Sequence, residues 1–353
     1  MKTRHVNLNS ASLIMLLSRC LRFGVLAAAW EANVVSTFPI GSAVDAARKL
    51  VPPAVRTSLN GELEGAEFWD EHDALLTQAW HELGPRRERL YTYDAAYEQA
   101  YVHQALHDAA NEARNGKGEE VVRSLFHEVV PGVFASSKIF TTRFTEDMMT
   151  ELVHIEQSGI PTRRPNGMNR YGVILDQVGM ERALRGLIYA YMRPLAAMLF
   201  PELVGLEDAD EHYAFTVRYE TDGDTELAKH GDASVVTVNL CMGNAGWKGG
   251  ELRFFKFDGT GLYALPENAS AGDGDVIFET GMVVFHRGQH KHQALPLRAG
   301  VRSNAIIWLM GRNDIVRVAP YKHHEHLSAS QRWDWPQTTA ANFDASRAMG
   351  EEL

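Results

Sequence analysis

The sequence predicts an α+β protein with helices in its first half and a β-rich second half. Up to about residue 204, apolar residues recur at three- and four-residue steps, the period of a helix with one buried face. After about residue 210 they alternate with polar residues, as in a strand, and glycines separate the short apolar runs. Several short strands joined by turns favour an antiparallel sandwich or barrel.

The composition is that of a globular protein with one large domain or two ordinary ones. The 353 residues are 45% hydrophobic and 23% charged, which excludes a disordered chain, a collagen and a coiled-coil rod. Because 35 Lys and Arg stand against 45 Asp and Glu, the net charge is −10, and we expect no nucleic-acid partner. The two cysteines, Cys20 and Cys241, are too few for a disulfide framework or a CxxC metal site.

The first 30 residues are basic and contain no acidic residue. Such a segment is typical of a peptide that targets a protein to an organelle or to secretion, and an N-terminal helix of the mature domain explains it equally well. Arg19 and Arg22 interrupt its apolar runs, which are therefore too short to span a membrane. We expect no transmembrane span elsewhere, and the compartment stays open between organelle, secretory pathway and cytoplasm.

Residues 31–204 are expected to form a mostly helical region. A helix at 70–83 ends at Gly84-Pro85, and a helix capped by Asp94 runs over 94–114. Thr145 is the expected N-cap of a third helix that ends near residue 156. The fourth, at 180–198, carries one apolar stripe that should face the core, with a kink at Pro194 and an end at Pro201.

The β-rich region is expected to extend over residues 205–315, followed by a polar tail at 316–353. A His-rich run at 322–326 in this tail could bind a metal adventitiously, although a solvated surface explains it more simply. The expected strands lie at 215–219, 235–240, 252–257, 276–278, 282–285 and 303–309.

His230 and Asp232 are the first candidates for chemistry. Residues two apart on a strand project from the same face, so their imidazole and carboxylate would point into one space. A further imidazole from His286, His290 or His292 would complete a set of two histidines and one carboxylate. This set, with open positions opposite, is the ligand set of non-heme Fe(II) oxygenases. A structural zinc site would close all four positions, usually with sulfur.

Arg302 is a candidate partner for a cosubstrate on the open metal face. A dicarboxylate that chelates the metal also needs a cation at its far end, and a guanidinium offers a planar fork that matches a carboxylate. Arg302 follows His292 by ten residues, with Gly300 between them for a turn. The alternative is a surface or interdomain ion pair, but the apolar residues 305–308 favour a buried strand.

Four motifs in order resemble the core of the Fe(II)/2-oxoglutarate-dependent dioxygenases. Within that superfamily they are most similar to the catalytic domain of procollagen lysyl hydroxylases, and the prolyl 4-hydroxylases are more distant. The resemblance covers about residues 210–310, under a third of the chain. The motifs are Val217-Arg218-Tyr219; Leu227 with His230-Gly231-Asp232-Ala233-Ser234; Thr237-Val238-Asn239 with Gly249-Gly250-Glu251; and Phe285-His286-Arg287-Gly288-Gln289-His290-Lys291-His292 with Leu295-Pro296 and Gly300-Val301-Arg302.

The resemblance implies the fold and the metal ligands. The fold would be a double-stranded β-helix, or jelly roll, at 205–315, braced by the helices of the N-terminal half. His230, Asp232 and His292 would hold the iron. His290 competes with His292, because it would lie on the same side if the strand continued.

The resemblance also implies the cosubstrate site and the activity. Arg302 would bind the distal carboxylate of 2-oxoglutarate, and Tyr219 and Asn239 would line the cosubstrate pocket, although both could instead satisfy core hydrogen bonds. The cofactors would be Fe(II), 2-oxoglutarate and O2, with ascorbate to restore oxidised iron. The reaction would be hydroxylation of an unactivated C–H bond with release of succinate and CO2.

The expected substrate is a protein Lys or Pro side chain, and a small molecule is the next choice. Residues 164–172 are unusually polar and aromatic for a connection; they could line the substrate mouth or form a structural turn before a strand at 173–175. Two other functions stay open. One is a cupin-like Zn or Mn metalloenzyme built on His290, His292 and His230 that does not use 2-oxoglutarate. The other is a catalytically silent jelly-roll binding module.

Overall fold

The computed structural model describes residues 42–50, 66–112, 120, 123–166, 168–204, 212–232, 234–243, 246–256 and 271–309. The segment expected at 1–30 for targeting or as a helix, and the polar tail at 316–353, lie outside these residues. Within the described part, no helix is both long and apolar enough to cross a membrane.

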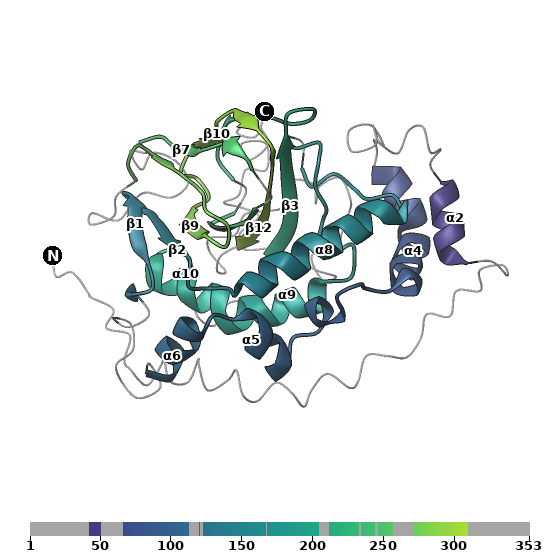
Figure 1. Ribbon diagram of the computed structural model, residues 1–353, viewed down its shortest axis with the longest axis horizontal. Helices are drawn as coiled ribbons and strands as arrows, with labels where there is room; N and C mark the ends of the chain where they lie inside the picture. The colour runs from purple at the N-terminus through teal and green to yellow at the C-terminus, as the bar shows by residue number, and fades with distance from the viewer. Residues whose placement is uncertain are drawn as a thin grey trace, which may run out of the picture.

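Two antiparallel sheets form the core of the molecule, and helices cover one face of the larger sheet (Figure 1). The larger sheet has the strand order β1-β2-β9-β5-β12-β3, and the smaller has β4-β10-β7-β8. This pair of facing sheets confirms the predicted α+β jelly roll. The strands are β1 His127–Val130, β2 Val133–Ser136, β3 His212–Glu220, β4 Leu227–His230, β5 Val236–Gly243, β6 Lys248–Gly249, β7 Leu252–Phe254, β8 Gly274–Val276, β9 Val283–Arg287, β10 His292–Ala294, β11 Leu297–Ala299 and β12 Val301–Leu309.

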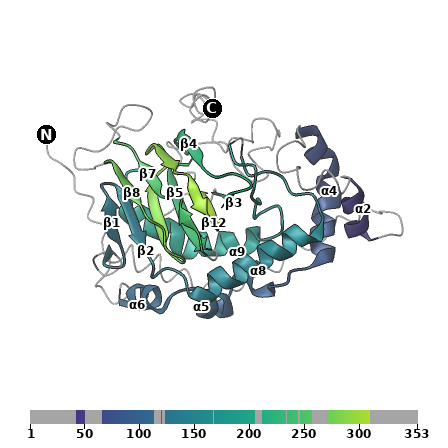
Figure 2. The ribbon, with the colours of Figure 1, turned by 45° about the horizontal axis from the view of Figure 1, so that its top comes forward.

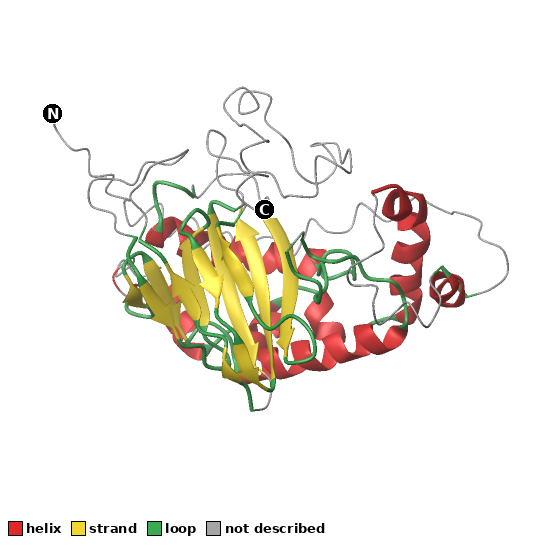
Figure 3. Cartoon of the chain, turned by 90° about the horizontal axis from the view of Figure 1, so that it is seen from above, coloured by secondary structure: helices red, strands yellow, loops and turns green. Residues whose placement is uncertain are grey.

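Helices such as α8 and α9 pack under the larger sheet, and α2 and α4 lie to one side of it, as Figures 2 and 3 show from two further directions. Because strand side chains alternate between faces, Val238, Phe285 and Ile307 point outward and share one buried cluster with the helices. The helices are α2 Ala43–Lys49, α4 Ala66–Leu83, the 3-10 helix η2 Glu88–Tyr91, α5 Ala95–Tyr101, α6 Gln104–Glu112, α8 Thr142–Ser158, α9 Glu181–Leu187, the π-helical turn η4 Ile188–Met192 and α10 Arg193–Leu199.

The helix predicted at 94–114 is two helices, α5 and α6. Asp94 caps α5 as expected, because its side chain accepts a hydrogen bond from the backbone N–H of Tyr97. Val102 then leaves the helical conformation, at φ −85° and ψ 130°, and forms a β-bridge with Phe140. Val102 and Phe140 are far apart in the sequence, so no local pattern predicts this contact or the break in the helix.

Helix α8 begins earlier than the sequence predicted. Thr141 occupies the N-cap position, and Thr145 lies inside the helix, where its hydroxyl donates to the Thr142 carbonyl. Gly159 ends the helix in the left-handed conformation, at φ 70°, which is the usual role of a glycine there.

The helix predicted at 180–198 is interrupted as Pro194 indicated. The interruption is the π-helical turn η4, which directly precedes the segment that contains Pro194. Proline lacks the N–H and crowds the carbonyl four residues earlier, and π-turns occur where an α-helix cannot continue regularly. The apolar stripe of this helix is buried in the main cluster, as predicted.

The region 31–204 is not helical throughout, because it contributes two strands to the larger sheet. Strands β1 and β2 form a hairpin around Gly132, and β2 pairs with β9, which places Phe134 opposite Phe285. The two strands have four residues each, too few for periodicity to distinguish them from loop.

Candidate functional site

The floor of the site is one row of side chains across the inner face of the larger sheet. Thr237 on β5 is paired with His286 on β9 and with Trp308 on β12. Trp308 is in turn paired with Tyr213 on β3. Four residues from distant parts of the chain therefore lie side by side at one level of the sheet.

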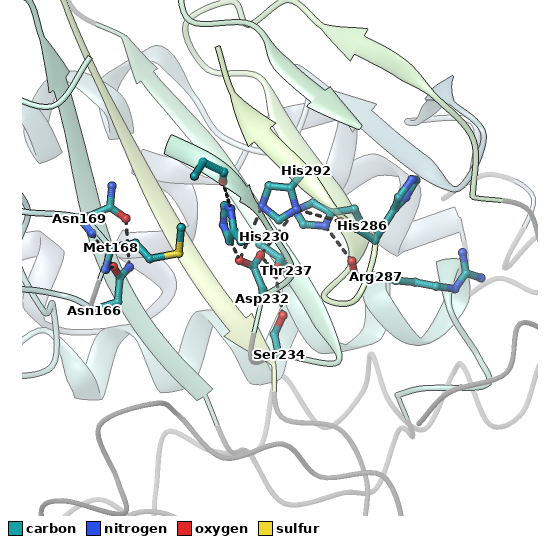
Figure 4. Close-up of polar contacts among 12 residues, drawn as sticks. Asn166, Met168, Asn169, His230, Asp232, Ser234, Thr237, His286, Arg287 and His292 are labelled. Atoms are coloured by element: carbon teal, nitrogen blue, oxygen red, sulfur yellow. Dashed lines mark hydrogen bonds and ion pairs between the residues drawn. The ribbon is translucent and has the colours of Figure 1, made fainter. Parts of the chain in front are cut away.

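The smaller sheet places the predicted metal ligands above this row. His230 is the last residue of β4, and His292, the first of β10, lies directly opposite it. Asp232 follows in a turn that is held by its own N–H, which donates to the Gly288 carbonyl at 2.7 Å. One ligand atom from each of the three residues lies within 4.8 Å of the other two, and all three residues are buried (Figure 4).

Each of the three ligands has its remaining polar atoms occupied by the protein. His230 Nδ1 lies 2.8 Å from the Ala228 carbonyl, and His292 Nδ1 lies 2.9 Å from the His290 carbonyl. A carbonyl can only accept, so each Nδ1 carries the proton and each Nε2 presents a lone pair. Thr237 donates to Asp232 Oδ2 at 2.5 Å, which leaves Oδ1 on the side of the imidazoles. Two neutral imidazoles and one carboxylate oxygen are a donor set that fits Fe(II).

The protonation states also suit a cation. Burial raises the pKa of the Asp232 carboxyl, but the neighbouring His292, His230 and His286 outweigh this effect. The net pKa of Asp232 lies well below its usual range. Burial holds the pKa of His292 well below that of a free imidazole, although Asp232 opposes the shift. The carboxylate is therefore charged and the imidazole neutral, as metal binding requires.

The other two candidate histidines do not join this group. His290 Nε2 lies 3.0 Å from the Gly272 carbonyl, and its ring packs on Phe254, with ring centroids 4.8 Å apart. His290 thus points away from the three ligand atoms. His286 lies behind Asp232, with 3.9 Å between His286 Nε2 and the second carboxylate oxygen, Oδ2.

A pocket of about 620 Å³, counted out to its open mouth, contains the metal ligands and the three predicted cosubstrate residues. Arg302 and Tyr219 are paired across β12 and β3, and Asn239 faces the pocket from β5. The structure therefore brings all six predicted site residues to one cavity. Apolar walls complete it, formed by Phe215, Val217, Leu227, Leu252, Phe278, Ala294, Ile306 and Trp308.

Arg302 is a buried cation without a carboxylate partner among the residues that the structure describes. It is 2% exposed, and no acidic side chain of the described residues lies within the 4.0 Å of an ion pair. Its Nη1 donates to the Gly250 carbonyl, its Nε has no partner, and its guanidinium carbon lies 5.1 Å from the ring centroids of Tyr219 and Phe278. A buried charge is costly unless it is paired, so this site fits an anionic ligand.

Gly250 allows the guanidinium to lie where it does. Its φ is 72°, and a Cβ atom at this position would come within 2.8 Å of Arg302 Nη1. The Gly249-Gly250 pair seen in the sequence is therefore explained by backbone conformation and by close approach.

Four pocket or support residues were not singled out from the sequence as site residues. Asn304 donates to Asn239 Oδ1 at 2.7 Å, so Asn239 both lines the pocket and satisfies a core hydrogen bond. Asn304 stands two residues after Arg302 on the same strand face, which was an available signal. Thr237 and Trp308 had no signal of comparable strength, because their roles depend on pairing across the fold, whereas Asn169 lies in the segment 164–172 that the sequence had indicated.

Part of the segment 164–172 lines the pocket, whereas its place at the substrate mouth stays a prediction. Asn166, Met168 and Asn169 line the pocket, and Figure 4 shows Met168 between the two asparagines and the metal ligands. The strand expected at 173–175 is reduced to one β-bridge, between Ile174 and Phe215 of β3.

Sequence comparisons agree with this geometry. A family model described as an OGFOD2-like domain matches residues 81–205. The 2-oxoglutarate and iron-dependent oxygenase domain-containing protein CP2 of Arabidopsis thaliana is 35% identical over 224 residues, 62% of this chain and 55% of that protein. The human 2-oxoglutarate and iron-dependent oxygenase domain-containing protein 2 is 38% identical over 172 residues, 48% of this chain and 47% of that protein.

These comparisons confirm the resemblance to the Fe(II)/2-oxoglutarate oxygenase superfamily. Human procollagen-lysine,2-oxoglutarate 5-dioxygenase 1 is a more distant relative in it, 25% identical over 179 residues, 48% of this chain and 22% of that protein. The chain spans about half the length of these curated oxygenase domain-containing relatives. Among solved structures, a prolyl hydroxylase from Trichoplax adhaerens superposes with a TM-score of 0.40 at 13% identity, over 61% of this chain and 96% of that one.

Proposed function

We propose that this chain is an Fe(II)- and 2-oxoglutarate-dependent dioxygenase that hydroxylates an unactivated C–H bond, with release of succinate and CO2. One observation carries the proposal. Three ligand atoms of a two-histidine, one-carboxylate set converge in a buried pocket whose other end holds Arg302, a cation without a carboxylate partner among the described residues.

The metal would be held by His230 Nε2, Asp232 Oδ1 and His292 Nε2. With 2-oxoglutarate and O2, Fe(II) supplies the oxidising chemistry of this superfamily. The protein keeps the two imidazoles neutral and aimed through hydrogen bonds to the backbone carbonyls of Ala228 and His290. The Thr237 hydroxyl holds Asp232 so that one carboxylate oxygen remains for the metal.

The cosubstrate would lie between the metal ligands and Arg302. The guanidinium would bind its distal carboxylate through charge-assisted hydrogen bonds. Tyr219 supports the guanidinium through its ring, and Asn239 and Asn304 form the polar floor next to it. The apolar walls exclude water, which strengthens these electrostatic interactions.

We propose a protein Lys or Pro side chain as the first substrate class and a small molecule as the second. The support is the activity for which one relative is named, a procollagen-lysine dioxygenase; fold alone does not define a substrate. Ascorbate is proposed as the reductant that restores oxidised iron.

An anaerobic titration tests the proposal. Fe(II) and then 2-oxoglutarate are added to the purified full chain, and we expect a visible metal-to-ligand charge-transfer band that requires both. Metal binding without the band would overturn the use of 2-oxoglutarate and favour the cupin-like Zn or Mn metalloenzyme. Failure to bind metal would favour a silent binding module.

A further inference from the structure

Asn166 organises the loop that forms one wall of the pocket. Its side-chain Oδ1 accepts from the backbone N–H groups of Met168 at 2.8 Å and Asn169 at 2.7 Å, which is the way asparagine stabilises a tight turn. The loop is fixed to β3 on both sides of this turn. Tyr213 donates its hydroxyl proton to the Pro165 carbonyl, and the N–H of Arg218 donates to Tyr171.

This turn fixes the orientation of the Asn169 amide. Asn166 Oδ1 faces two backbone donors, so Asn166 Nδ2 must be the atom that faces Asn169, and it donates to Asn169 Oδ1 at 3.1 Å. A reversed Asn169 amide would oppose two NH2 groups. Asn169 Nδ2 is therefore directed away from Asn166. Among the described residues it has no hydrogen-bond partner within 3.5 Å, and Asn169 is 1% exposed.

The free donor of Asn169 lies at the anion end of the pocket. Asn169 lines the same cavity as Tyr219 and Arg302. Burial raises the pKa of Tyr219, and the nearby Arg302 and a long hydrogen-bonding approach of the Asn169 amide lower it in part. The amide therefore faces the phenol oxygen, but from beyond the 3.5 Å of a full hydrogen bond. Asn304 also has a free buried atom, but that atom is an acceptor and would repel a carboxylate.

We propose that Asn169 Nδ2 is a hydrogen-bond donor to the distal carboxylate of 2-oxoglutarate, and that Asn166 positions it. A buried donor without a partner is destabilising, whereas a carboxylate held by Arg302 would satisfy it. A loop from the N-terminal half of the chain thus completes the cosubstrate site of the jelly roll. The inference rests on the proposed function, because it requires that 2-oxoglutarate bind there.

The test is the same anaerobic titration on the Fe(II)-loaded full chain, with Asn169→Ala, Asn169→Asp and the control Gln104→Ala. Gln104 carries a carboxamide on the distant helix α6. We expect the dissociation constant for 2-oxoglutarate to rise about tenfold in Asn169→Ala, equivalent to about 1.4 kcal/mol. It should rise further in Asn169→Asp, because the new carboxylate repels the ligand. Both Asn169 variants should bind Fe(II) with the affinity of the wild type. The Gln104→Ala variant should bind both Fe(II) and 2-oxoglutarate as the wild type does.

A second ligand separates a contact with the distal carboxylate from general damage to the pocket. 2-Oxobutanoate has the chelating 2-oxo acid but no distal carboxylate, so Asn169→Ala should bind it as wild type does. Asn166→Asp keeps the oxygen that accepts from the turn backbone but removes the NH2 group that donates to Asn169. The Asn169 amide should then reverse, so that its NH2 group faces the new carboxylate. We expect the affinity for 2-oxoglutarate to fall while the thermal midpoint of unfolding is unchanged.

The outcomes distinguish this inference from the proposed function. A wild-type band with unchanged 2-oxoglutarate affinity in both Asn169 variants would overturn this inference alone. An equal loss of affinity for 2-oxobutanoate in Asn169→Ala would also overturn it. No band in wild type would overturn the proposed function, and this inference with it.

Discussion

The two ends of the pocket differ in how far the protein satisfies its own polar groups. At the metal end, both histidine Nδ1 atoms and the second oxygen of Asp232 have protein partners, and one ligand atom on each residue is left for a metal. At the anion end, Arg302 Nε and Asn169 Nδ2 are buried without hydrogen-bond partners in the described part of the chain. The metal end is thus completed by a single cation, whereas the anion end requires a ligand with acceptor atoms.

The difference indicates what kind of molecule the pocket orients. A carboxylate and two neutral imidazoles at one end attract a cation, and a buried guanidinium at the other attracts an anion. A ligand that chelates the metal and carries a distant carboxylate satisfies both ends at once. Because the groups are already held in place, little ordering remains to oppose its binding.

The largest expected effect is the loss of the metal site in His292→Ala. Removal of one of three ligands should lower Fe(II) affinity by more than the 10- to 100-fold that outer partners of metal ligands typically contribute. His290→Ala is the matched control, since His290 points to Gly272. Calorimetric titration with Fe(II) under anaerobic conditions measures both. Metal loss in His290→Ala with retention in His292→Ala would reverse the assignment of the third ligand.

Arg302→Ala should separate the two ends of the pocket. Hydrogen bonds to charged groups are worth about 1.5–3 kcal/mol, so loss of the fork should weaken 2-oxoglutarate binding by at least about 100-fold while Fe(II) still binds. Arg302→Lys should recover only part of the affinity, because an ammonium lacks the fork. Titration of the charge-transfer band provides the measurement. Unchanged 2-oxoglutarate affinity in Arg302→Ala would show that the anion end lies elsewhere.

Thr237→Val should weaken the metal end without removing a ligand. The hydroxyl that holds Asp232 Oδ2 is lost, and we expect Fe(II) affinity to fall about 10- to 100-fold, as for other outer partners. Thr237→Ser keeps the hydroxyl and should restore most of the affinity. If valine and serine variants bind Fe(II) equally well, the hydrogen bond does not orient the carboxylate.

The smallest effect concerns stability at the anion end. Arg302→Met replaces an unpaired buried cation with an apolar side chain of similar length, and such replacements are often neutral or stabilising. We expect the free energy of unfolding of the metal-free protein to rise by about 1 kcal/mol, measured by urea denaturation. A clear decrease would mean that the hydrogen bond to Gly250 and the ring contacts outweigh the cost of the buried charge.

The sequence alone determined the parts of this protein that depend on local geometry. His230 and Asp232 share one space because residues two apart on an extended chain project together. The stripe at 180–198 is buried because its spacing matches one helix face, and the interruption follows from Pro194. The long β12 strand with Arg302 near its start was also visible, since its apolar run is continuous.

Only the tertiary structure decided the rest, because the deciding contacts join residues far apart in the chain. His290 and His292 would share a face if the strand included both, but β10 begins at His292, and His290 lies in the preceding turn. Strands β1 and β2 join the larger sheet through pairing with β9. Asn169 lines the same pocket as Tyr219, 50 positions away, because its loop is fixed to β3. Local propensity contains no information on such pairings. The metal ligands were therefore predictable from spacing, whereas for residues 164–172 the sequence left two roles open and only the structure placed them at the pocket.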